Sequence, residues 1–75
     1  MVFDKIREIV CEQTGLDLDE ITLESSFADD LGYDILAIVD LISAIEDEFK
    51  IKIPDSEAER LITVGDVVDY INSCN

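Results

Sequence analysis

The fold is decided by residues 31–49, which read Leu-Gly-Tyr-Asp-Ile-Leu-Ala-Ile-Val-Asp-Leu-Ile-Ser-Ala-Ile-Glu-Asp-Glu-Phe. Gly32 permits a turn, and Asp34 is suited to capping a helix because its carboxylate accepts the free amide hydrogens of a first helical turn. From Ile35 to Phe49 there is no Gly or Pro, and good helix formers predominate. The stretch therefore predicts one helix of about four turns.

The two faces of this predicted helix differ in character. At about 100° per residue, one broad face is apolar and is expected to be core; it carries Ile38, Leu41, Ile42, Ile45 and Phe49, with Val39 at its margin. The opposite stripe mixes carboxylates with an apolar residue, as a docking surface does, and carries Leu36, Asp40, Ser43, Ala44 and Asp47. Ile35 lies roughly 60° from the centre of the apolar face. It either packs in part against the loop around Phe27 or points into solvent.

Composition limits the classes of function. With 75 residues, of which 48% are hydrophobic, the chain is expected to form a single domain over residues 1–75 with its own core. Nineteen acidic against five basic residues give a formal charge of −14, which opposes binding to nucleic acid and favours basic partners. Size and charge favour a monomer.

Residues for catalysis or metal binding are scarce. The chain has no histidine, its serines lack a partner base, and its Asp-rich segments lack the spacing of a calcium loop, so no catalytic residue and no metal site is predicted. No apolar run approaches the roughly 20 residues of a membrane span, and the protein is expected in the cytoplasm. Cys11 and Cys74 are expected to be free thiols there.

The remaining segments predict an all-α fold. Helical periodicity covers residues 3–14 and 64–72, with Thr63 capping the latter, and a brief helix follows Pro54 with Asp55 as its cap. Residues 16–30 are expected to form an ordered loop with at most one helical turn, pinned by Leu16, Ile21, Leu23 and Phe27. This order of elements predicts a small four-helix bundle with a long first loop and a short third helix.

These motifs together resemble the acyl carrier protein family. Its signature is Leu-Gly-x-Asp-Ser-Leu followed by an acidic helix that ends in Glu-(Glu/Asp)-Glu-Phe, and here residues 31–34, Leu36, Asp40, Leu41 and 46–49 match it. The Ile-Pro-Asp-x-Glu-Ala-Glu segment and the closing Thr-Val-x-x-x-x-Asp-Tyr-Ile also resemble the family, so the likeness covers the whole chain. The attachment serine is the exception, because Ile35 occupies its position.

The resemblance implies a non-enzymatic carrier of fatty acid or related acyl and polyketide synthesis. In the family, a transferase joins 4'-phosphopantetheine from coenzyme A to the serine hydroxyl, and the thiol of that group then carries acyl thioesters. Isoleucine has no hydroxyl, so this chain is expected to stay in the unmodified form.

The resemblance also implies two groups of site residues. Carboxylates that meet basic patches of acyl-processing enzymes or of the transferase correspond to Asp34, Asp40, Glu46 and Asp47, with Leu36 as an apolar anchor. The region that stores acyl chains corresponds to Ile45, Ala58, Leu61 and Val67, which are equally expected as ordinary core. Ala37 stands where the family often has a carboxylate.

Two hypotheses remain open at this point. The first is an acyl carrier protein or close homologue whose attachment residue has been replaced, naturally or by engineering. The second is an acidic interaction or regulatory protein that binds a basic partner through its central helix and uses no cofactor.

Overall fold

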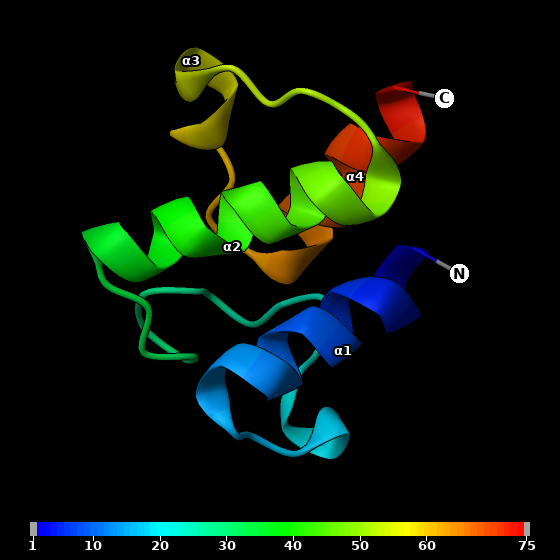
Figure 1. Ribbon diagram of the computed structural model, residues 1–75. Helices are drawn as coiled ribbons and strands as arrows, with labels where there is room; N and C mark the ends of the chain where they lie inside the picture. Colours follow the sequence, from blue (N-terminus) through cyan, green and yellow to red (C-terminus); the bar gives the residue numbers. More distant parts are fainter. Residues whose placement is uncertain (1, 75) are drawn as a thin grey trace.

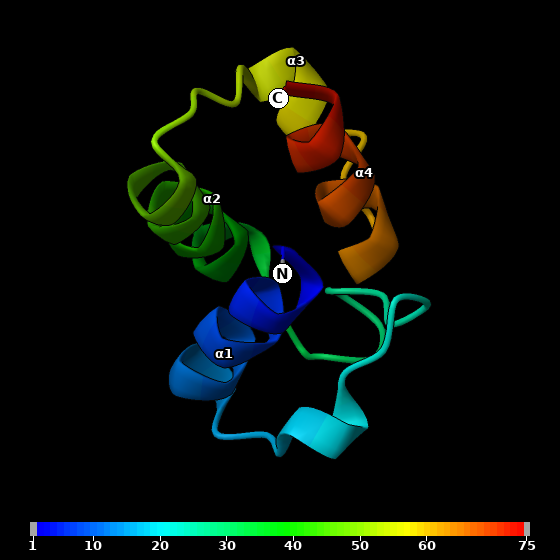
Figure 2. The ribbon, with the colours of Figure 1, turned by 90° about the vertical axis from the view of Figure 1, so that its right-hand side faces the viewer.

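The computed structural model describes residues 2–74, and the elements of secondary structure within them are all helices. In chain order these are α1 (Val2–Thr14), the short 3-10 helix η1 (Leu18–Glu20), α2 (Ile35–Phe49), α3 (Asp55–Ala58) and α4 (Val64–Cys74). α1 packs against both α2 and α4 (Figure 1), and the short α3 lies at one end of the molecule (Figure 2). The predicted all-α bundle with a long first loop and a short third helix is confirmed.

The core is built from one apolar stripe on each long helix. Ile6 and Val10 of α1, Ile45 of α2, and Val64 and Val67 of α4 are completely shielded from solvent. Their spacing of three or four residues keeps them on the inner face of each helix. Side chains from the connections complete the same core: Ile21, Phe27, Leu31, Tyr33 and Ile53.

Local hydrogen bonds fix where the helices begin and end. The Asp34 carboxylate accepts the Ala37 N–H at 2.7 Å, and the Thr63 hydroxyl accepts the Asp66 N–H at 3.2 Å, as predicted for both caps. Gly15, with φ of +79°, ends α1 and donates its N–H to the Cys11 carbonyl at 2.8 Å. The prediction that Asp55 caps the third helix is wrong by one residue, since Pro54 occupies the cap position and Asp55 begins the helix.

The long first loop is held by its backbone as much as by its side chains. Ile21 and Phe27 are buried as predicted, but Leu23 is 47% exposed, so it does not pin the loop with its side chain. Its carbonyl instead accepts the Gly65 N–H at 2.8 Å, and Ser26 and Thr63 form an isolated β-bridge. A Cβ at Gly65 would lie 2.9 Å from the Leu23 oxygen, so this approach requires glycine. Hydrophobic periodicity carries no information about such backbone pairing.

Two side chains hold the extended link between α2 and α3. Glu46 accepts the N–H of the buried Ile53 at 2.7 Å, and the Tyr70 hydroxyl donates to the Lys52 carbonyl at 3.4 Å. The link runs back from the end of α2, so that α3 lies beside the first half of α2.

Candidate functional site

The candidate site is centred on Ile35, the first residue of α2. Asp34 caps the helix and thereby fixes the direction in which the next side chain points. Ile35 is 82% exposed, so of the two orientations left open by its helical position the outward one is correct. An isoleucine at this position contributes little to the core, and it presents a branched hydrocarbon to solvent.

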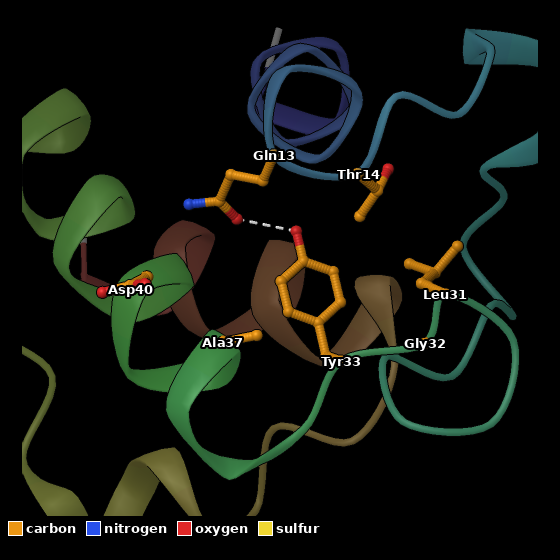
Figure 3. A pocket seen from close by; sticks show the side chains of 7 residues that line it. All are labelled: Gln13, Thr14, Leu31, Gly32, Tyr33, Ala37 and Asp40. Atoms are coloured by element: carbon orange, nitrogen blue, oxygen red, sulfur yellow. Dashed lines mark hydrogen bonds between the residues drawn. The ribbon is translucent and has the colours of Figure 1, made fainter.

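The turn before α2 is anchored by Tyr33. Its N–H donates to the Phe27 carbonyl at 2.8 Å, and the two rings meet edge to face with centroids 5.7 Å apart. The Tyr33 hydroxyl donates to Gln13 Oε1 at 2.7 Å, which ties the turn to the end of α1 (Figure 3). Burial, assisted by the nearby Cys11 thiol, raises the pKa of Tyr33 to about 12. This anchor holds the start of α2, and hence position 35, in place.

A small pocket of about 400 Å³ lies beside this anchor. Figure 3 shows the Tyr33 side chain crossing it toward Gln13, with Ala37 and Asp40 of α2 on one side and Leu31 on the other. Ala37 contributes only a methyl group to the lining of this pocket. The hydrogen bond between Tyr33 and Gln13 was not predicted from the sequence, because a contact between residues 20 positions apart leaves no local pattern.

An apolar groove of about 500 Å³ lies on the other side of position 35, between α2, α3 and the first loop. Its lining includes Ile35, Ile38 and Val39 from α2, and Ala58, Leu61 and Ile62 from the segment around α3. Asp55 and Glu59 also line it. We call this feature the apolar groove. Ile62, which is 61% exposed, was missed in the sequence because it lies in a turn without periodicity.

The residues expected to contact partners are not equivalent in the structure. Leu36, Asp40 and Asp47 lie along one exposed stripe of α2, and Asp34 is exposed at its start. Glu46 is half-buried, and its carboxylate accepts the Ile53 N–H inside the molecule. Four of the five residues therefore face solvent, while Glu46 has a structural role as well.

The residues expected to line an acyl cavity divide into two pairs. Ala58 and Leu61 are half-buried and line the apolar groove. Ile45 and Val67 are completely buried in the core and are not part of the groove lining. The groove thus has two of the four expected residues at its surface.

The chemistry of position 35 does not fit a phosphodiester-linked group. Attachment needs an accessible hydroxyl, and the exposed side chain here is a hydrocarbon. The location and exposure of position 35 are suited to a covalently attached group, but the isoleucine at this position has no atom to which the group could be joined.

Other classes of site receive no support from the described residues. Between residues 2 and 74, no group of three or more His, Cys, Asp or Glu side chains is arranged to hold a metal ion. No helix in the same range combines the length and hydropathy that crossing a membrane requires.

Comparison with known proteins gives a consistent result. The family model described as "Phosphopantetheine attachment site" matches residues 4–71, which include position 35. A protein named "Acyl carrier protein" from Clostridium acetobutylicum is 56% identical over 73 residues, covering 97% of this chain and 95% of that protein. Another of the same name from Clostridium perfringens is 54% identical over 70 residues, covering 93% and 92%.

Proposed function

This chain belongs to the acyl carrier protein family, and from that premise we propose that it is a carrier domain of fatty acid biosynthesis, silenced at its attachment residue. The family consists of carriers rather than catalysts, and its cofactor is 4'-phosphopantetheine. The comparisons favour this carrier function over a cofactor-free regulatory protein.

The observation that carries the proposal is the presentation of position 35. Ile35 is 82% exposed, and the Asp34 cap and the Tyr33 hydrogen bond hold the backbone on which it stands. An attachment residue must be accessible and held in place in this way. Only the hydroxyl is missing. The scaffold is therefore proposed to be competent and the chain itself to remain unmodified.

Members of this family interact with acyl-processing enzymes and with phosphopantetheinyl transferases. For this chain we propose Asp34, Leu36, Asp40 and Asp47 as the contact stripe toward basic patches of such enzymes, with Glu46 at its edge. Exposed carboxylates steer encounter and orientation more than they add affinity.

The proposed acyl-binding region is the apolar groove at Ala58 and Leu61, with Ile45 and Val67 in the core. We also propose that the protein is a cytoplasmic monomer. Its charge of −14 supports the monomeric state, because two copies repel each other.

Restoring the hydroxyl tests the proposal directly. After incubation with coenzyme A, Mg²⁺ and a broad-specificity phosphopantetheinyl transferase, the intact mass of Ile35→Ser is expected to rise by one phosphopantetheine, while the unchanged chain gains nothing. Because Ile35 is exposed, the substitution should leave the fold intact.

Two controls sharpen the result. Ile35→Ala removes the branched side chain without supplying a hydroxyl, and Leu36→Ser supplies an exposed hydroxyl one position away; neither should gain mass. If Ile35→Ser keeps its circular dichroism spectrum and is still not modified, the carrier proposal is wrong.

A further inference from the structure

Two exposed leucines lie together beside the start of α1, away from position 35. Leu18 of η1 and Leu23 of the first loop are 45% and 47% exposed, and both line one hollow of about 440 Å³. Phe3 and Arg7 of α1 form part of its wall, and we call this feature the first-loop hollow. It shares no lining residue with the apolar groove, and η1 and α3 lie at opposite ends of the molecule in both views (Figure 1, Figure 2). A single exposed leucine is ordinary, but two that share a hollow mark a binding surface.

Backbone hydrogen bonds hold Leu23 in its exposed position. It stands in a turn in which the Ser25 N–H donates to the Thr22 carbonyl at 3.1 Å and the Thr22 N–H donates to Ser25 Oγ at 3.0 Å. The Leu23 carbonyl accepts the Gly65 N–H at 2.8 Å, which fastens the turn to α4. The loop is therefore ordered around an apolar side chain that the core does not use.

Leu18 is held in a similar way at the start of η1. The Glu20 carboxylate accepts the Asp17 N–H at 2.9 Å, and this capping box fixes the single helical turn to which Leu18 belongs. Both leucines thus stand on fixed backbone before any partner arrives. A surface that is already ordered loses little conformational entropy on binding, which favours affinity.

The charges at the hollow define what can bind there. The Arg7 guanidinium lies over the Phe3 ring, 4.7 Å from its centroid, and its charge is offset by Asp4 at 2.7 Å. Asp19 and Glu24 also line the hollow and are exposed. Because the Arg7–Asp4 pair is the single salt bridge among residues 2–74, the charge left unbalanced at the hollow is negative. It repels a fatty acid carboxylate, an anionic lipid surface and a second copy of this acidic chain.

We propose that the first-loop hollow binds a short segment of a partner protein in which an aromatic or aliphatic anchor side chain is flanked by lysine or arginine. The anchor packs between Leu18 and Leu23, and the basic residues face Asp19 and Glu24. This surface lies outside both position 35 and the contact stripe of α2. It therefore binds its partner whether or not position 35 carries a group.

An NMR titration of the isotope-labelled chain tests the proposal at low salt. The probe is the peptide Lys-Lys-Phe-Leu-Lys-Lys, and its matched control is Lys-Lys-Ser-Ser-Lys-Lys, which has the same charge and no anchor. The amides of Leu18 and Leu23 are expected to shift saturably with the first peptide and only slightly with the second. The amides of Ile35 and Val39 should respond alike to both peptides.

Substitutions separate the apolar part of binding from the charged part. Leu18→Ser and Leu23→Ser are each expected to weaken binding about fivefold, because apolar area buried by the anchor is lost. Val39→Ser is the matched control, since Val39 is 57% exposed but lies at the apolar groove. It should bind the peptide like the unchanged chain.

A charge variant keeps both leucines in place. Asp19→Asn with Glu24→Gln should weaken binding about threefold at low salt and by less at high salt, because the attraction is screened. Neither carboxylate accepts a hydrogen bond within the described part of the chain, so this variant remains informative even if a serine variant loses its fold.

Several outcomes overturn the inference. Binding of both Leu18→Ser and Leu23→Ser within twofold of Val39→Ser would show that the peptide is held by charge alone. Largest shifts on α2 and α3 would place the peptide in the apolar groove instead. Stronger shifts of the Leu18 and Leu23 amides with octanoate than with the peptide would assign the hollow to an acyl chain. None of these results bears on the carrier proposal, which is tested by the intact mass of Ile35→Ser.

Discussion

Two neighbouring residues at the start of α2 have different roles: one side chain is exposed to solvent and the other holds the helix start in place. Ile35 points outward and contributes little to packing, whereas Tyr33, two positions earlier, is only 6% exposed and contacts both Phe27 and Gln13. The sequence alone allowed the cap at Asp34 to be predicted, because capping depends on neighbouring residues. It left the orientation of Ile35 open, since its position at the margin of the apolar face is compatible with both directions.

The Tyr33 anchor should make stability depend on alkaline pH. Its pKa is about 12 in the folded protein and about 10 in the unfolded chain, so the folded state holds this proton more tightly. The corresponding stability is fully present below pH 10 and is lost as the pH rises through about 12. By pH 11 the loss should be about 1.4 kcal/mol.

Urea unfolding of the unchanged chain and of Tyr33→Phe between about pH 8 and 11 measures this difference. At pH 8 the phenylalanine variant should be less stable by about 1 kcal/mol, because the hydrogen bond to Gln13 is missing. At pH 11 the gap should close. Parallel pH profiles for the two proteins would contradict the assignment.

At the scale of elements, α2 serves two surfaces with different residues. Its inner face, with Leu41 and Ile45, holds the bundle together, and its outer stripe carries Leu36, Asp40 and Asp47. Periodicity predicted this division because a helix repeats every 3.6 residues. Periodicity could not predict the backbone pairing of the first loop with the start of α4, nor that Glu46 turns inward to bind the Ile53 N–H.

Charge reversal on the outer stripe should impair docking in a salt-dependent manner. Asp40→Lys with Asp47→Lys is expected to weaken association with a phosphopantetheinyl transferase by about tenfold at low salt and by much less at high salt. Surface plasmon resonance at several NaCl concentrations would measure this.

Glu8→Lys with Asp69→Lys is the matched control, since it makes the same change in net charge on exposed positions of α1 and α4. Equal losses for both pairs would show that net charge alone matters. A loss for the α2 pair that does not depend on salt would contradict electrostatic steering.

The molecule as a whole carries a large unbalanced charge. Its formal charge is −14, and among residues 2–74 the ion pair between Arg7 and Asp4, at 2.7 Å, is the single salt bridge. Composition alone predicted this imbalance, because five cations cannot neutralise nineteen carboxylates. Repulsion among these carboxylates opposes the compact state.

Salt should therefore stabilise the fold. Raising NaCl from about 0.01 M to 1 M shortens the Debye length from about 30 Å to 3 Å and should add at least about 1 kcal/mol to the free energy of unfolding. In a chain of this size that corresponds to a rise of roughly 4–8 °C in Tm by calorimetry. Mg²⁺ and Ca²⁺ should also raise the Tm, because divalent cations screen the repulsion among the carboxylates. An unchanged Tm would show that repulsion is a minor factor.

The β-bridge between Ser26 and Thr63 also has a consequence for the order of folding. It closes a loop of nearly half the chain, and the entropy of such a closure must be offset by contacts made at the same time. The first loop therefore gains its ordered backbone together with α4 rather than with α1, its neighbour in sequence. In native-state hydrogen exchange, the amides of Phe27 and Gly65, which donate to the Ile62 and Leu23 carbonyls on either side of this bridge, should exchange as one cooperative unit.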